Sequence, residues 1–220
     1  MFDPEYEREL SEKDLETRKL KQSVLWPALF TAALWAVEIA KHAFELELWK
    51  YGVRPGDWWG LTGILTGPLI HGGFKHLFNN SVPLIVSGAG ILYLYRAFAA
   101  RVFIIVYLLS GLAVWLFARP SSHIGASGLT YGFVCFIFFS GVFRREAPAI
   151  ALALIVTFLY GGMAWGVFPI QEGVSWESHL AGAVIGFTLA FAFRKSNLPP
   201  PPDWGDDDDD EDYYIYERER

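Results

Sequence analysis

The sequence of 220 residues has one cysteine, Cys135, and its start has no recognisable secretion signal. A single cysteine excludes an intrachain disulfide. Residues 1–22 are rich in Glu, Lys and Arg and contain no short apolar core, which argues against a cleavable signal peptide. Their many acidic residues also argue against a mitochondrial presequence.

Charged residues are scarce in six stretches of the chain, which is 53% hydrophobic and 17% aromatic overall. Apolar stretches of about 18–20 residues indicate membrane spans rather than a soluble core. The predicted spans are 23–43, 75–95, 101–118, 127–143, 147–165 and 178–193, with a less regular Gly/Thr-rich lead-in at 61–74. We therefore expect an all-α polytopic membrane protein with its membrane domain at residues 23–195.

Basic residues in the short connections favour one side of the predicted bundle. That side holds Lys13, Arg18, Lys19, Lys21, Arg96, Arg101, Arg144, Arg145, Arg194 and Lys195, and the opposite side holds Lys50, Arg54 and Arg119. Because positively charged loops stay in the cytosol, both termini are predicted to be cytosolic. Residues 1–22 would form a cytosolic segment, and a plasma membrane, bacterial in the simplest case, is the expected location.

The ends and the long outer loop carry no predicted chemistry. The formal net charge of −6 comes from residues 199–220, whose own net charge is −8. Prolines followed by an acidic block predict a disordered tail at residues 196–220. The loop at 44–74 contains Trp49, Tyr51, Trp58 and Trp59, which indicate either an interfacial belt or an amphipathic element that shapes lateral access.

Three polar residues in different spans are predicted to lie at one depth. Ser127 is 17 residues before Arg144, His179 is 15 before Arg194, and Asn80 is 16 before Arg96. At 1.5 Å per helical residue these separations are about 25, 22 and 24 Å. A hydrocarbon core is roughly 30 Å thick, so the three side chains would meet in its outer half.

Small residues flank the serine and the histidine. The chain reads Gly125-Ala126-Ser127-Gly128, and pairs of glycines four residues apart occur at Gly128 and Gly132 and at Gly182 and Gly186. This spacing lets two membrane helices approach closely. A serine nucleophile and its base need such an approach, since they must reach about 2.6–3.2 Å.

His179 is the candidate base, because an imidazole with a pKa of about 6.5 can accept and return a proton near neutral pH. No Asp or Glu lies at comparable depth in the fourth or sixth predicted span, so the sequence predicts a Ser127–His179 dyad without a carboxylate. Tyr131, one turn after Ser127, either orients the His179 ring or is a core aromatic.

The lead-in to the second span contains His71, and the start of the span contains His76 and Asn80. Zinc usually takes three or four protein ligands, and no Cys or His-Glu-x-x-His pattern completes a set, so we expect no metal and no cofactor. Donors for a developing oxyanion explain His76 and Asn80 better, although a purely structural Asn80 stays open.

Four polar residues outside this layer have simpler interpretations. Glu38 and Lys41 are predicted to form an ion pair that lowers the cost of membrane placement, with no part in catalysis. His42 and His123 are expected at the membrane interface.

Taken in order, these motifs resemble the rhomboid family of intramembrane serine proteases over residues 58–193. The resemblance rests on His71, His76 and Asn80, on Gly125–Gly128 with Tyr131, and on His179 to Gly182 with Gly186. It implies a six-helix bundle with a cavity open to the outer face, Ser127 as nucleophile and His179 as base. It further implies an oxyanion hole formed by Asn80, His76 and the Ser127 backbone N–H, and a supporting Tyr131.

The sequence departs from the family at Trp58-Trp59, where some bacterial members have a Trp-Arg pair, so the detailed structure of the first loop stays open. The predicted function is cleavage of transmembrane protein substrates near the outer face, with the lipid bilayer as the other partner and no nucleic acid. A rhomboid-like protein that binds membrane clients without cleaving them, and a polar-lined transporter, are the alternatives.

Overall fold

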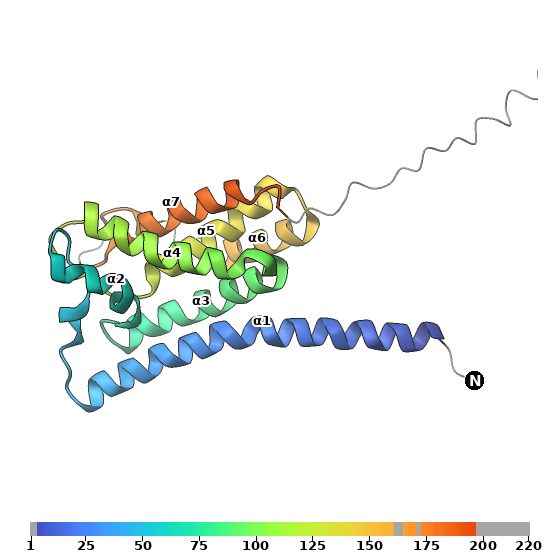
Figure 1. Ribbon diagram of the computed structural model, residues 1–220, viewed down its shortest axis with the longest axis horizontal. Helices are drawn as coiled ribbons and strands as arrows, with labels where there is room; N and C mark the ends of the chain where they lie inside the picture. The colour runs from blue at the N-terminus through green and yellow to red at the C-terminus, as the bar shows by residue number, and fades with distance from the viewer. Residues whose placement is uncertain (1–3, 161–164, 171–172, 197–220) are drawn as a thin grey trace, which may run out of the picture.

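The computed structural model describes residues 4–160, 165–170 and 173–196, and within these ranges the chain is built from helices without a β-strand (Figure 1). The longer helices are α1 (Pro4–Ala43), α3 (Phe74–Leu94), α4 (Arg96–Phe117), α5 (Ser127–Arg144), α6 (Ala147–Tyr160) and α7 (Trp176–Ala192). Between α1 and α3 lie the short turns η1 (Leu48–Tyr51), η2 (Trp58–Thr62), α2 (Gly63–Thr66) and η3 (Gly67–Leu69). The all-α prediction is confirmed for the described residues.

Four helical segments are long and apolar enough to cross a membrane, namely Lys13–Ala43, Phe74–Leu94, Arg96–Phe117 and Ser127–Arg144. Large apolar side chains on the outside of the bundle would contact lipid, and the side chain of Phe117 is 84% exposed in the isolated chain. The described parts of α6 and α7 have 14 and 17 residues, fewer than the roughly 20 of a typical span. The chain is a multi-pass membrane protein, and the number six stays a prediction.

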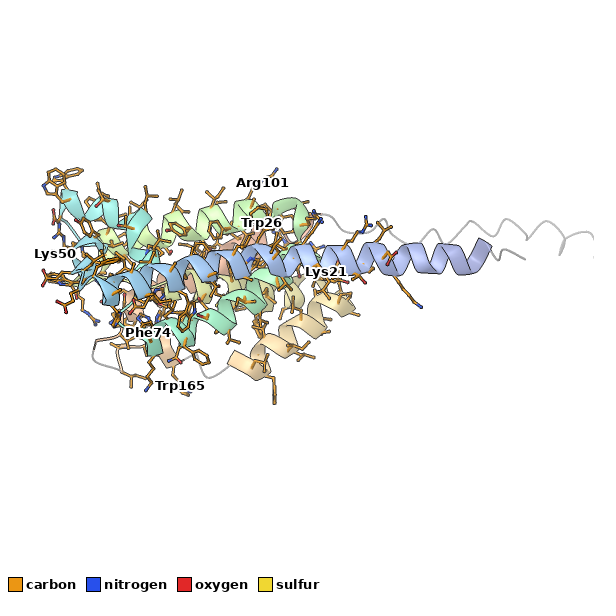
Figure 2. All side chains as sticks on the ribbon, turned by 90° about the horizontal axis from the view of Figure 1, so that it is seen from below. Lys21, Trp26, Lys50, Phe74, Arg101 and Trp165 are labelled. Atoms are coloured by element: carbon orange, nitrogen blue, oxygen red, sulfur yellow. The ribbon has the colours of Figure 1, made fainter. Side chains whose placement is uncertain are left out.

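Helix α1 begins at Pro4, well before residue 23 where the first span was predicted to start. Its first part projects past the bundle near Lys21, whereas Lys50 lies at the opposite end (Figure 2). The charged residues of this part are good helix formers. Contacts with the next helices also hold it, since the Tyr93 hydroxyl donates to Glu16 at 2.7 Å and Arg96 donates to Gln22 at 3.0 Å.

The connection between α3 and α4 is shorter than predicted. The predicted spans leave residues 96–100 between them, but α4 begins at Arg96 and only Tyr95 separates the two helices. Tyr95 is buried, and its ring lies 5.6 Å from Phe98 and 5.4 Å from Phe136. The chain can turn here within one residue because that aromatic ring fills the corner.

Helix α5 is the centre of the bundle. It packs most extensively against α7 and also contacts α3, α4 and α6. Of the four long apolar helices it buries the largest share of its surface within the protein. At its end, Arg144 donates to the carbonyls of Phe193 and Ser196, which fastens the end of α7 to α5.

The other predicted boundaries agree closely with the helices. The fourth predicted span, 127–143, corresponds to Ser127–Arg144, and the sixth, 178–193, to Trp176–Ala192. Residues 161–164 of the fifth predicted span lie outside the described residues, as does the tail from residue 197. The start of α1 and the end of α7 lie toward the same end of the molecule (Figure 1).

Candidate active site

Ser127 is the first residue of α5 and is 7% exposed. The loop before it is held at two points: Gly125 N–H donates to the Gly67 carbonyl at 2.9 Å, and His123 exchanges backbone hydrogen bonds with Val53. Gly125 has φ = +111°, a conformation that side-chain-bearing residues rarely adopt. The glycine therefore lets the chain turn directly into the helix that begins with the serine.

His179 lies in the first turn of α7 and is 8% exposed. Its ring stacks on Tyr131, with centroids 4.1 Å apart and planes 7° from parallel. Its Nδ1 lies 2.8 Å from the carbonyl oxygen of Gly166. A carbonyl can only accept, so Nδ1 carries the proton, and in the neutral ring Nε2 is left as the acceptor.

Glycines bring the beginnings of α5 and α7 into contact. A Cβ atom on Gly182 would overlap the carbonyl oxygen of Gly128, and one on Gly186 would overlap that of Gly132. A Cβ on Gly128 would lie 2.6 Å from the hydroxyl of Ser178, the neighbour of His179. The predicted glycine pairs thus face each other, and the helix turns that carry Ser127 and His179 are adjacent.

His76 and Asn80 are one turn apart on α3, and Asn80 is 5% exposed. The His76 ring faces the turn before the serine, because a Cβ on Gly125 would lie 2.7 Å from its Cε1 and 3.0 Å from its Nε2. The Asn80 side-chain amide donates to the His76 carbonyl at 3.2 Å. Both side chains thus come from the helix that faces the Gly125 turn.

His71 precedes α3 and is 1% exposed. Its Nε2 accepts a hydrogen bond from the backbone N–H of Ala126 at 3.2 Å, and its ring is edge-on to that of His76 at 5.1 Å. Burial, assisted by the nearby His76 and Lys41, lowers the pKa of His71 to about 3. A neutral ring at ordinary pH is what allows Nε2 to accept the Ala126 N–H.

Three observations go beyond the sequence predictions. The contact of Gly166 with His179 was not predicted, because every residue has a backbone carbonyl and the sequence does not show which one meets the histidine. Lys41 forms the predicted ion pair with Glu38 at 2.7 Å, but it also donates to the His71 carbonyl. His123, expected at the interface, is 5% exposed and bonded to the Ser175 hydroxyl at 2.6 Å, because the backbone pairing with Val53 draws it inward.

Comparisons with known proteins identify the family of the chain. The rhomboid domain model matches residues 55–196. The uncharacterised protein Rv1337 of Mycobacterium tuberculosis is 37% identical over 176 residues, which cover 74% of this chain and 71% of that protein. The uncharacterised protein ML1171 of Mycobacterium leprae is 34% identical over 171 residues, with coverage of 74% and 68%.

A more distant relative has a functional name. YdcA of Bacillus subtilis, provisionally named as a rhomboid protease, is 28% identical over 173 residues, which cover 73% of this chain and 82% of that protein. The match to the rhomboid domain model, at residues 55–196, contains all the predicted site residues, from His71 to Gly186. On the family match and the mycobacterial similarity, the chain belongs to the rhomboid family.

Proposed function

We propose that the protein is an intramembrane serine endopeptidase that uses Ser127 and His179 to cleave transmembrane protein substrates near the outer membrane face. The observation that carries this proposal is the fixed His179 ring, stacked on Tyr131 and bonded through Nδ1 to Gly166. That orientation leaves Nε2 as a base at the contact between α5 and α7. The Gly166 carbonyl takes the orienting role that a carboxylate has in a Ser-His-Asp triad.

The first half of the reaction forms an acyl-enzyme. The Ser127 Oγ attacks the scissile carbonyl carbon as its proton passes to His179 Nε2. When the tetrahedral intermediate collapses, the C–N bond breaks and His179 returns the proton to the leaving amine. The substrate must unwind locally for this attack, because the carbonyls of an intact helix are shielded by their hydrogen bonds.

The second half releases the new carboxyl terminus. A water molecule entering from the outer face attacks the ester carbon and gives one proton to His179 Nε2. The ester C–O bond then breaks, and the proton returns to the Ser127 oxygen. The site is thereby restored without a cofactor.

An oxyanion hole formed by Asn80, His76 and the Ser127 backbone N–H completes the proposal. Ser127 begins α5, and the first N–H groups of a helix have no acceptor within that helix. The His76 ring faces Gly125, two residues before Ser127. Removing one such donor typically lowers kcat by about 10²–10³-fold.

Six helices would cross a bacterial plasma membrane, with both termini cytosolic and the membrane domain at residues 23–195. The basic residues of the connections and the common end of α1 and α7 support this topology (Figure 1). The described part of α1 before residue 23 would then extend into the cytosol, where the expected disordered acidic tail at residues 196–220 would also lie.

A fluorophosphonate probe tests the proposal directly. Purified wild-type protein should be labelled, whereas Ser127→Ala and His179→Ala should not. Ser140→Ala is the matched control, because Ser140 is a buried serine of the same helix, about 20 Å further along it. A well-folded wild type that resists labelling would contradict the protease and support a non-cleaving client-binding protein.

Mapping the cut in a co-expressed single-span substrate tests the depth of the site. We expect Ser127-dependent cleavage in the outer half of the substrate span. A cut in the cytosolic half would contradict the proposed position of the site.

A further inference from the structure

Helix α1 carries an ion pair in its apolar part. The side chain of Glu38 is 1% exposed and that of Lys41 is 16% exposed, and Lys41 Nζ lies 2.7 Å from Glu38 Oε1. A buried ion pair in a membrane helix is expensive and contributes little to stability, so its presence suggests a functional role. Both residues precede residue 55, where the match to the rhomboid domain begins.

Lys41 reaches beyond its own helix. Its Nζ donates to the carbonyl oxygen of His71 at 2.6 Å, across 30 positions of sequence. A hydrogen bond from an ammonium group is roughly twice as strong as a neutral one, and Glu38 holds the ammonium from the other side. The turn before α3 is thus fixed to α1 by a charge-assisted bond.

That turn contacts the predicted active site in two places. The His71 side chain accepts the N–H of Ala126, the residue before Ser127, at 3.2 Å. The N–H of Gly72 points to Nδ1 of His76 at 3.4 Å. A displacement of the His71 carbonyl would therefore move both the start of α5 and the ring of His76.

We propose that Glu38 and Lys41 are positioning residues, which hold the turn at His71 and Gly72 so that it fixes the backbone at Ala126 and the ring of His76. The catalytic consequence rests on the proposed function, whereas the structural link to Ala126 does not. Without the pair, the Ser127 hydroxyl would still be able to act as a nucleophile, but it would no longer be aligned with the oxyanion donors. Small misplacements of this kind can lower a rate by about 10²-fold.

Replacing both residues tests the positioning role without the added effect of an unpaired buried charge. Glu38→Leu with Lys41→Leu removes the ion pair without leaving one buried charge unpaired, so the protein should stay folded. We expect kcat for a single-span substrate to fall roughly 10- to 100-fold with KM within about twofold, since misalignment acts on the reacting groups rather than on substrate binding. The single variant Lys41→Arg keeps a charged donor beside Glu38. Its kcat should therefore lie between that of the double leucine variant and that of wild type.

Trp35→Phe is the matched control. Trp35 Nε1 donates to Ser81 Oγ at 3.0 Å, so this change also removes a bond between α1 and α3, but one that does not reach the turn. Its kcat should stay within about twofold of wild type. If the double leucine variant is as active as this control, the positioning role is wrong.

Hydrogen exchange at the Ala126 amide provides a readout independent of activity. In the folded double leucine variant this amide should exchange roughly tenfold faster than in wild type or Trp35→Phe, because its acceptor His71 is less constrained. Unchanged exchange would overturn the inference. Faster exchange in a protein that neither cleaves substrate nor reacts with a fluorophosphonate would support the structural link and refute the proposed protease.

Discussion

At the scale of single residues, the ring of His179 is held by two residues, Tyr131 and Gly166, which also contact each other. Tyr131 stacks on it, the Gly166 carbonyl holds Nδ1, and a Cβ on Gly166 would overlap the Tyr131 hydroxyl. These contacts leave the ring little freedom to rotate. The orientation of the proposed base thus depends on a residue that has no side chain.

Gly166→Ala should lower kcat by roughly 10- to 100-fold, because the new methyl group must displace Tyr131 or the backbone that holds His179. Cleavage of a single-span substrate measures the effect, with KM followed separately. The double variant Gly166→Ala, Tyr131→Phe removes the hydroxyl that the methyl group meets. This double variant should be more active than Gly166→Ala alone. Equal activity of the two variants would contradict a steric clash between the new methyl group and the Tyr131 hydroxyl.

Residue types revealed the side chains of the candidate site but not the backbone groups. Ser127, His179 and the glycine pairs could be predicted because each has a recognisable spacing. The Gly166 carbonyl and the Ala126 N–H could not, because every residue carries these groups and only the folded chain brings them to a histidine.

At the scale of helices, the contact between α5 and α7 depends on the absence of side chains. The backbone of Gly182 lies against the carbonyl oxygen of Gly128, and that of Gly186 against the carbonyl oxygen of Gly132. Neither carbonyl can move without bending its helix. The distance between the two helices is therefore set by backbone contact.

Gly182→Ala should destabilise the folded protein by about 1–3 kcal/mol and strongly reduce fluorophosphonate labelling, because the helices must separate. Thermal unfolding in detergent and the labelling rate measure the two effects. Gly90→Ala is the control, since its methyl group would meet only movable side-chain atoms of Leu152 and Ile137. If the Gly182→Ala protein is as stable and reactive as this control, the conclusion that backbone contact sets the distance between α5 and α7 is wrong.

Helix boundaries were predictable where they coincide with a change from apolar to charged residues. The predicted end of α5 and the predicted start of α6 agree with the structure for this reason, since Arg144, Arg145 and Glu146 lie between the two apolar stretches. The early start of α1 was missed because polarity signals the membrane boundary and not the end of a helix. The turn at Tyr95 was missed because the packing of one ring, rather than a run of polar residues, makes it possible.

At the scale of the whole molecule, the ends of the described chain lie at one end of the bundle, and the connection between α1 and α3 lies at the other (Figures 1 and 2). In a Cys135→Ser background, intact cells treated with a membrane-impermeant maleimide should label Lys50→Cys and not Lys13→Cys. The reason is that the basic connections keep the end with Lys13 in the cytosol. Lys13→Cys should react once the cells are opened, and the reverse pattern would contradict the proposed orientation.

The central position of α5 has a consequence for how the protein is made. This helix is the least apolar of the four long candidate spans and buries the largest share of its surface against other helices. A segment whose polar residues are satisfied by neighbouring helices partitions weakly into lipid by itself. We therefore expect α5 to enter the bilayer together with helices already in place, so that Ser127 reaches its depth only as the bundle assembles around it.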